Sequence, residues 1–219
     1  SGLQGELIKA VHSTGTPTIV VLINGRPLSI RWTAENIPAI LEAWNCGEQG
    51  GNAIADILFG DYNPDGRLTV TFPRHVGQLP CYYNHTAYKK YWIGKKGFVD
   101  MASTPLYYFG HGLSYTTFEY SDLKILPEEP GPGSTINVSM EVRNTGDRQG
   151  GEVVQLYIND VISSVTTPVI ELQGFKKVWL EPGEKRTVNF TILPEQLEML
   201  DKYMNPVVEP GTFEVMIGH

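Results

Sequence analysis

The sequence predicts an α/β part followed by an all-β part: a partial α/β sandwich built on a doubly wound, mostly parallel sheet, and then a β-sandwich. Three observations predict this fold class. Helix-like and strand-like segments alternate over residues 1–72, short alternating apolar segments fill residues 118–219, and residues 73–117 show no sustained period. We therefore expect two domains joined by a long connector.

Four segments predict the α/β part. Apolar residues at helical spacing predict a helix over residues 4–12. The continuous, largely β-branched run of residues 18–23 is typical of a strand that is buried on both faces of a parallel sheet. Residues 39–44 are ambiguous by periodicity, and the glycine-rich turn after them favours a strand. Residues 53–59 predict a helix closed by Gly60, so that strand, glycine-rich turn and helix indicate one end of a doubly wound sheet.

The α/β part is expected to be incomplete. A doubly wound domain normally has about five or six strands, and fewer are predicted before residue 73. Apolar surface would then be exposed, so we expect the chain to self-associate, for instance as a homodimer.

The connector, residues 73–117, is rich in tyrosine and glycine. An ordered stretch of this length without regular structure is uncommon and is usually functional or wrapped over another domain. We expect it to run across the α/β part toward the β-sandwich. Its aromatic side chains could stack on sugar rings or anchor the connector by burial, and burial is favoured. These aromatic residues are Tyr82, Tyr83, Tyr88, Tyr91, Trp92, Phe98, Tyr107, Tyr108 and Phe109.

The all-β part, residues 118–219, is predicted from repeated short strands with turn clusters between several of them. Beyond the strand-like start of this part, alternating segments occur at residues 136–142, 153–158, 185–192 and 212–217. The proline- and glycine-rich residues 126–133 are interpreted as a loop inside the sandwich rather than as a linker. We expect the sandwich to lack its last strand, which would leave an unpaired edge, and both ends of the chain to be cuts through a larger protein.

Composition excludes several classes of function. The formal net charge of -7 argues against a nucleic-acid partner. No apolar run is long enough to span a membrane. Cys46 and Cys81 are too few for a disulfide framework and badly spaced for a zinc site, and the five histidines are scattered without metal-ligand spacing. The sequence therefore predicts no metal and no cofactor.

The glycine-rich residues 47–51 lie where an α/β sheet commonly presents its ligand loop. A tight turn is the favoured interpretation, and the alternative is a turn whose Glu48 or Gln49 also lines a polar cleft. The calcium-loop pattern that begins at Asp61 has Phe72 where the bidentate glutamate is required, so a plain turn is predicted there. Ser114 does not match a nucleophile elbow, and no catalytic triad is evident.

Longer motifs occur in a fixed order along nearly the whole chain. They are VVLINGRPL (20–28), AWNCGEQGGNAIAD (43–56), FGDYNPDGRL (59–68), TFPR (71–74), PLYYFGHGLSYT (105–116), EVVQLYI (152–158), ELQGFKK (171–177) and VEPGTFEV (208–215). In this order and spacing the chain closely resembles glycoside hydrolase family three, the β-glucosidases and β-xylosidases. It departs from the family at Asn45 and Cys46, where an aromatic or aliphatic residue and a proline are common.

The resemblance implies an N-terminal (β/α)₈-like barrel, an α/β sandwich and a fibronectin type III-like domain. It also implies a barrel aspartate as nucleophile and a glutamate upstream of this chain as general acid/base. Retaining hydrolysis needs both carboxylates about 5 to 5.5 Å apart. Neither motif occurs here, so no catalytic residue is assigned and the chain alone is expected to be inactive.

The resemblance therefore implies the C-terminal part of a retaining β-glycosidase that hydrolyses terminal β-linked glucose or xylose from oligosaccharides. Its partners would be the glycoside substrate and the barrel domain, and the family suits a secreted or periplasmic protein. The alternative is a non-catalytic carbohydrate- or protein-binding module built on the fibronectin-like sandwich.

Overall fold

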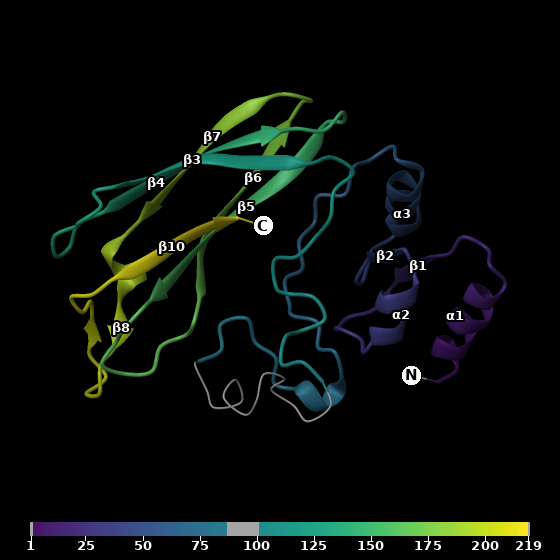
Figure 1. Cartoon of the computed structure of the whole chain (residues 1–219), viewed down its shortest axis with the longest axis horizontal. Helices are drawn as coiled ribbons and strands as arrows, with labels where there is room; N and C mark the ends of the chain where they lie inside the picture. Colours follow the sequence, from purple (N-terminus) through teal and green to yellow (C-terminus); the bar gives the residue numbers. More distant parts are fainter. Residues whose placement is uncertain (1, 87–100, 219) are drawn as a thin grey trace.

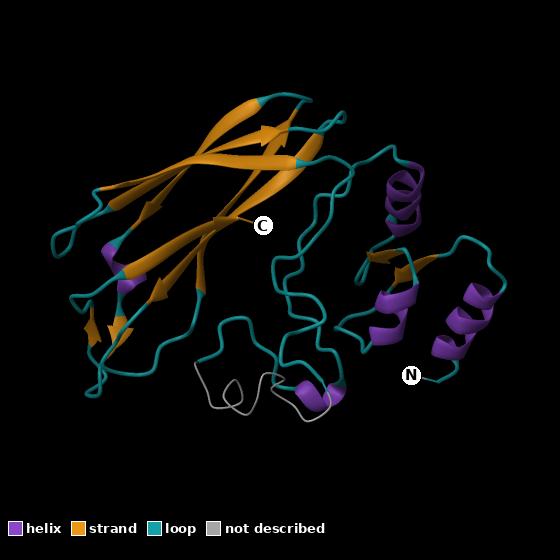
Figure 2. Ribbon diagram, viewed as in Figure 1, coloured by secondary structure: helices purple, strands orange, loops and turns teal. Residues whose placement is uncertain are grey.

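The computed structural model describes residues 2–86 and 101–218. Helices lie mainly in the first part of the chain and long strands in the second (Figure 2). The helices are α1 (Gln4–Ser13), α2 (Arg31–Asn36) and α3 (Gly50–Phe59), with short 3-10 turns at Val76–Gln78 and Pro194–Leu197. The strands are β1 (Ile19–Leu22), β2 (Ala39–Glu42), β3 (Phe118–Leu126), β4 (Ile136–Asn144), β5 (Gly150–Asp160), β6 (Glu171–Leu180), β7 (Lys185–Ile192), β8 (Met199–Leu200), β9 (Pro206–Val207) and β10 (Phe213–Gly218).

The α/β part contains a parallel pair of strands, β1 and β2, in which Leu22 lies opposite Glu42. The predicted helix at residues 4–12, the two predicted strands and the predicted helix ending at Gly60 are confirmed as α1, β1, β2 and α3. Gly60 has a φ of 84°, the left-handed conformation that commonly ends a helix. Among the described residues this sheet has two strands, so the doubly wound arrangement stays a prediction.

The prediction that β1 is buried on both faces is wrong for this structure. Val20 and Leu22 are buried, but Ile19 on the opposite face is 52% exposed. A continuous apolar run indicates that both faces of a strand can be buried. Burial of each face still requires another segment to pack on it. In the described residues, α2 and the segment around Phe72 contribute to the cluster on the buried face.

The all-β part is a sandwich of two antiparallel sheets, β3-β4-β7 and β10-β5-β6 (Figure 1). Every second residue of β4 is buried, and the apolar ones, at positions 136–142, meet the inward residues of β5 and β7 in one core. The strands predicted at residues 136–142, 153–158, 185–192 and 212–217 are confirmed. Of the predicted loop at residues 126–133, residues 127–133 lie in the loop between β3 and β4, and residue 126 ends β3.

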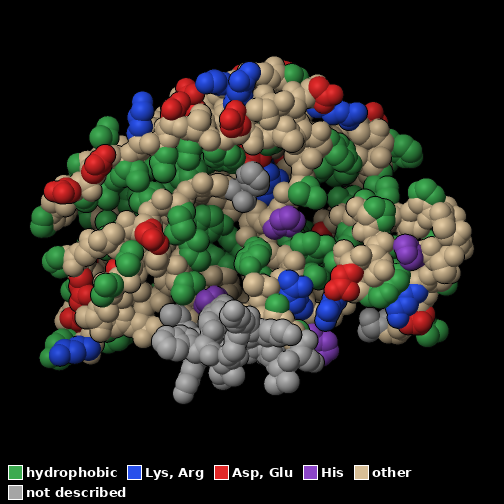
Figure 3. All heavy atoms as spheres, viewed as in Figure 1, with side chains coloured by type: hydrophobic (Ala, Val, Ile, Leu, Met, Phe, Trp, Pro, Cys, Tyr) green, Lys and Arg blue, Asp and Glu red, His purple; other side chains and the backbone are tan. Residues whose placement is uncertain are grey.

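Strand β10 forms an edge of the sandwich, because among the described residues it pairs only with β5. Its inward side chains Phe213, Val215 and Ile217 pack against the core but remain partly exposed. Figure 3 shows hydrophobic side chains gathered along the gap between the two sheets near this edge. The core is therefore less completely covered here than around β4.

Two segments of the chain run side by side between the two parts (Figure 1). Backbone hydrogen bonds join Leu68 to Gly110 and His111, and Phe72 to Leu106 and Tyr107. The segments are antiparallel at the bridge between Phe72 and Tyr107. They place residues 61–68 next to the sandwich, although these residues follow directly from α3.

The aromatic residues of the connector serve partly as anchors. Tyr83 stacks on Phe109 with 4.1 Å between ring centroids, and its edge meets Tyr157 on β5. Tyr82 and Tyr108 are exposed. The remaining connector aromatics, Tyr88, Tyr91, Trp92 and Phe98, lie outside the described residues.

Candidate functional site

Polar side chains meet where the parallel strands β1 and β2 end. Glu42, the last residue of β2, is partly buried and accepts hydrogen bonds from Asn24 Nδ2 at 3.1 and 3.2 Å. The same carboxylate accepts a bond of 3.0 Å from the backbone N–H of Trp44. Ligands of open α/β sheets bind outside the carboxyl ends of the strands. This edge is therefore the candidate functional site of the α/β part.

The loops on this edge are held in a defined shape. Trp44 has a φ of 51°, which is unusual for a residue with a bulky side chain. The Asn24 carbonyl oxygen Oδ1 accepts a 3.1 Å bond from the backbone N–H of Arg26. A Cβ on Gly25 would lie 3.0 Å from Asn45 Nδ2, so the two loops approach closely. Glu42 thus fixes the turns that follow both strands.

Glu48 and Gln49, the residues predicted to line a cleft, lie on the loop between β2 and α3 and are exposed. Gln49 directly precedes α3, and its Oε1 accepts a 2.6 Å bond from Asn52 Nδ2. Neither residue lines the large groove described next. Their role in a cleft stays a prediction. The tight turn that was the favoured interpretation is formed by residues 47–50, where the N–H of Gly50 donates to the backbone oxygen of Gly47 at 2.9 Å.

An open apolar groove of about 1480 Å³ lies between α1, β1 and the segments around residues 26–30 and 69–84. Leu7 and Ile23 are among the exposed side chains that line it. No aspartate or glutamate is among the described residues of its lining, and Arg26 supplies a positive charge there. The groove therefore lacks the carboxylate pair that glycosidic bond cleavage requires.

The described residues also contain no group of three His, Cys, Asp or Glu side chains that could hold a metal ion. Within the same residues no helix is both long enough and apolar enough to cross a membrane. Cys46 and Cys81 both remain thiols.

Sequence reasoning missed Asn24, Glu42 and Trp44. The signal that could have found them is their position, because each lies at or near the carboxyl end of a predicted strand of the parallel pair. Their contact depends on the strand register, which brings residues 18 positions apart to the same edge. Polar residues at the carboxyl ends of both predicted strands would have indicated a candidate site at this edge.

Comparisons with known proteins cover almost the whole chain. A model of the glycosyl hydrolase family 3 C-terminal domain matches residues 1–115, and a model of the fibronectin type III-like domain matches residues 152–219. A β-xylosidase of Formosa agariphila is 48% identical over 99% of this chain and 30% of its own length. A periplasmic β-glucosidase of Salmonella typhimurium is 46% identical over 98% of this chain and 29% of its own length.

Solved structures show the same likeness. A β-glucosidase from Erythrobacter marinus matches all of this chain with a TM-score of 0.92 at 50% identity, over 28% of its own chain. A β-glucosidase from Listeria innocua in complex with glucose matches 98% of this chain with a TM-score of 0.91 at 37% identity, over 31% of its own chain. This chain spans about 30% of the length of such relatives. It belongs to the glycosyl hydrolase family 3 C-terminal domain family, and a fibronectin type III-like domain follows that domain in the chain.

Proposed function

We propose that this chain is the C-terminal part of a retaining β-glycosidase that hydrolyses terminal β-linked glucose or xylose from oligosaccharides. The observation that carries the proposal is the coverage: nearly all of this chain matches, but only 29 to 30% of the relatives named as a β-xylosidase and a β-glucosidase. The nucleophile and the general acid/base then belong to upstream polypeptide. This chain contributes support and part of the cleft wall.

The open groove supports this division of labour. The groove exposes apolar side chains beside α1 and β1, such as Leu7 and Ile23, and Ile19 on one face of β1 is also exposed. Such a face is stabilised when another layer packs on it. We propose that upstream strands and helices extend β1 and β2 into a doubly wound sheet, and that a barrel domain lies beyond the carboxyl edge.

In that arrangement the carboxyl edge of β1 and β2 forms part of the substrate cleft. Glu48 and Gln49 are exposed on the loop that follows β2 and line the cleft from this side. Their role is to contact the sugar hydroxyls rather than to react. A short loop with a fixed backbone suits such contacts because little backbone freedom is lost on binding.

The first experiment compares the isolated chain with the longer protein on chromogenic β-glucosides and β-xylosides. We expect turnover by the longer protein and none by the isolated chain. Turnover by the pure isolated chain would refute the proposal, because the reacting carboxylates would then have to lie on this chain.

A second experiment tests the cleft wall in the longer protein. Glu48→Ala and Gln49→Ala are expected to raise KM several-fold with a smaller change in kcat, because binding contacts are lost and not reacting groups. Glu128→Ala, in the exposed loop between β3 and β4, is the matched control and should leave both constants unchanged. An unchanged KM in both cleft variants would remove the two residues from the cleft.

The remaining expectations concern assembly and location. The open edge of β10 suits one further strand, which would complete the sandwich. The isolated chain should self-associate through its groove, and a clean monomer in size-exclusion chromatography would count against this. A secreted or periplasmic location is proposed because the Salmonella typhimurium relative is named a periplasmic enzyme.

A further inference from the structure

Residues 61–67, here called the 61–67 loop, follow α3 and pack against the fibronectin-like part. The side chain of Asn63 anchors the first half of this loop by hydrogen bonds. Its Nδ2 donates to the backbone oxygen of Gln149 at 3.0 Å, beside the start of β5. Its Oδ1 accepts from Ser114 Oγ at 3.0 Å and from the N–H of Tyr115 at 2.7 Å. One amide side chain therefore joins the loop, the connector and the sandwich.

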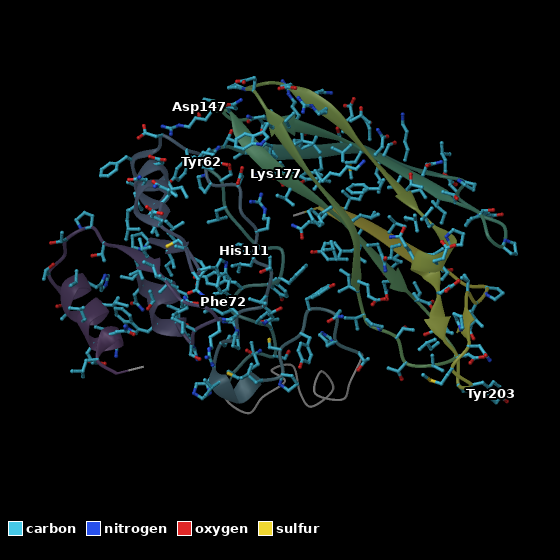
Figure 4. The ribbon with its side chains drawn as sticks, turned by 180° about the vertical axis from the view of Figure 1, so that it is seen from behind. Tyr62, Phe72, His111, Asp147, Lys177 and Tyr203 are labelled. Atoms are coloured by element: carbon cyan, nitrogen blue, oxygen red, sulfur yellow. The ribbon has the colours of Figure 1, made fainter. Side chains whose placement is uncertain are left out.

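Asp65 makes the second contact. Its carboxylate is 2.6 Å from Lys177 Nζ on β6 and accepts a 2.9 Å bond from the Tyr62 hydroxyl. The Tyr62 ring meets Trp179 edge-on, with 5.8 Å between centroids. Figure 4 shows Tyr62 and Lys177 on facing sides of this junction. Polar and aromatic contacts thus occur together on the outer face of β6.

Arg67 makes the deepest contact. Its Nη2 lies 2.6 Å from Glu152 Oε2, and the two side chains are only 7% and 0% exposed. The other oxygen of Glu152 accepts a 2.6 Å bond from the Tyr120 hydroxyl on β3. Glu152 belongs to β5, which lies in the opposite sheet from β3. A single buried carboxylate therefore ties both sheets of the sandwich to the arginine of the 61–67 loop.

Glycines make this close approach sterically feasible. A Cβ on Gly151 would lie 2.6 Å from Asp65 Oδ2, and a Cβ on Gly150 would lie 2.7 Å from Asn63 Nδ2. On the other side, a Cβ on Gly112 would lie 2.3 Å from the backbone oxygen of residue 66. Real Cβ atoms do not approach other atoms this closely, so a side chain at any of these positions would push the loop away.

The charges make the two parts depend on each other. Burying one ion without its partner is strongly unfavourable, because its hydration is lost without a compensating interaction. Glu152 is fully buried when the loop is docked, and the guanidinium that neutralises it comes from the α/β side. Loss of the guanidinium while the loop stays docked would leave this buried carboxylate without the charge of Arg67.

We propose that Arg67, Glu152 and Tyr120 form a latch that couples the α/β part and the sandwich into one cooperative folding unit. The sandwich is then a fixed support for residues 61–67 and the connector, and not a mobile binding module. This inference concerns folding and domain coupling, and its test needs no enzymatic activity. It can therefore fail while the proposed function stands.

The test uses Arg67→Met, Glu152→Gln and the double variant in the full chain. A broken buried pair is expected to lower the melting temperature by about 6 to 20 °C for Arg67→Met. The double variant should regain at least half of that loss, because no buried charge remains. The Nε of Arg67 has no hydrogen-bond partner among the described residues, so removing the guanidinium also removes a buried unpaired donor.

Arg186→Met is the matched control. Arg186 and Glu184 also form a pair at 2.6 Å, but their side chains are 47% and 33% exposed. Exposed pairs contribute little, so this control should shift the melting temperature by less than about 4 °C. The latch would be overturned if Arg67→Met lowered the melting temperature by no more than Arg186→Met does. If Arg67→Met does not fold, a folded double variant supports the latch, and an unfolded double variant beside a folded control overturns it.

Hydrogen exchange tests the coupling directly. In the unaltered chain the slowest amides of α3 and β4 should exchange through the same global opening. In Arg67→Met the α3 amides should exchange at least about 100-fold faster, because the α/β part now opens without the sandwich. The β4 amides should change much less. Independent exchange of α3 and β4 in the unaltered chain would refute cooperative coupling.

Discussion

Replacing Gly110 with alanine should disrupt the contact between the connector and β5. Gly110 has a φ of 80°, and its added Cβ would lie 2.3 Å from Gln155 Oε1 and 2.9 Å from the Tyr157 hydroxyl. Gly183 supplies a matched control, because its φ is 79° and no atom lies within 4 Å of its Cβ position. The pair of variants separates the strain of the backbone from the loss of the contact.

The magnitude follows from these contacts. The left-handed conformation costs alanine about 1 to 2 kcal/mol at either position. At Gly110 the new methyl group must also displace Gln155, whose Nε2 donates to the Gly110 oxygen at 3.1 Å and whose Oε1 accepts from Tyr157 at 2.5 Å. Each lost hydrogen bond costs about 1 kcal/mol. We expect a loss of about 3 to 4 kcal/mol for Gly110→Ala and about 1 to 2 kcal/mol for Gly183→Ala.

Urea unfolding followed by circular dichroism measures both free energies of unfolding. Gln155→Ala in the Gly110→Ala background adds a third comparison, because it removes the atom that the new methyl group meets. The double variant should therefore lose less stability than the sum of the two single losses. The reasoning is refuted if Gly110→Ala costs no more than Gly183→Ala, or if the two substitutions at 110 and 155 are additive.

Three further predictions concern other buried groups. Phe72 is 2% exposed and packs between Trp44 and Tyr107. Phe72→Ala should therefore lower the free energy of unfolding in urea by about 3 to 5 kcal/mol. A loss below about 1 kcal/mol would show that this ring is not a core residue. Gln78 is 2% exposed and accepts from the N–H of Arg74, so Gln78→Ala should cost about 1 to 3 kcal/mol by leaving this partly buried donor unpaired. Equal thermal stability to the parent chain would contradict this. Burial, with a smaller effect of a neighbouring tyrosine, raises the pKa of Tyr157 from its usual 10.0 to about 12. The folded state thus favours the protonated phenol, and this stabilisation is complete below pH 10 and is lost as the pH rises from about 10 to about 12. Tyr157→Phe should therefore lose less stability than the parent chain across that window, and parallel losses in urea titrations at both ends of it would count against the assignment.

Local pattern predicted much of the fold because the relevant signals are short in sequence. In β4 the alternate residues Ile136, Val138, Met140 and Val142 are apolar and buried, so a period of two is visible directly. Gly60 marked the end of α3 because its left-handed φ favours glycine. Strand β6 was missed because exposed Phe175, Lys176 and Lys177 interrupt the expected alternation. Helix α2 was missed because it has six residues and no side-chain cap.

The candidate site was less predictable because its contacts join distant residues. Asn24 and Glu42 meet only through the register of β1 and β2, which no local pattern specifies. Arg67 and Glu152 are 85 positions apart and belong to different domains. A sequence shows that an arginine and a glutamate are present, but their burial together depends on the docking of two folded parts.

The neighbouring glycines 150 and 151 have a practical consequence for exchanging domains between relatives. In a transplanted sandwich with larger residues at these two positions, the added side chains would occupy the space that Asn63 and Asp65 fill in this chain. Its own strands could fold correctly, yet the graft would sit displaced from its host. Compatibility of such chimaeras should therefore be judged first from this pair of positions, before overall identity is considered.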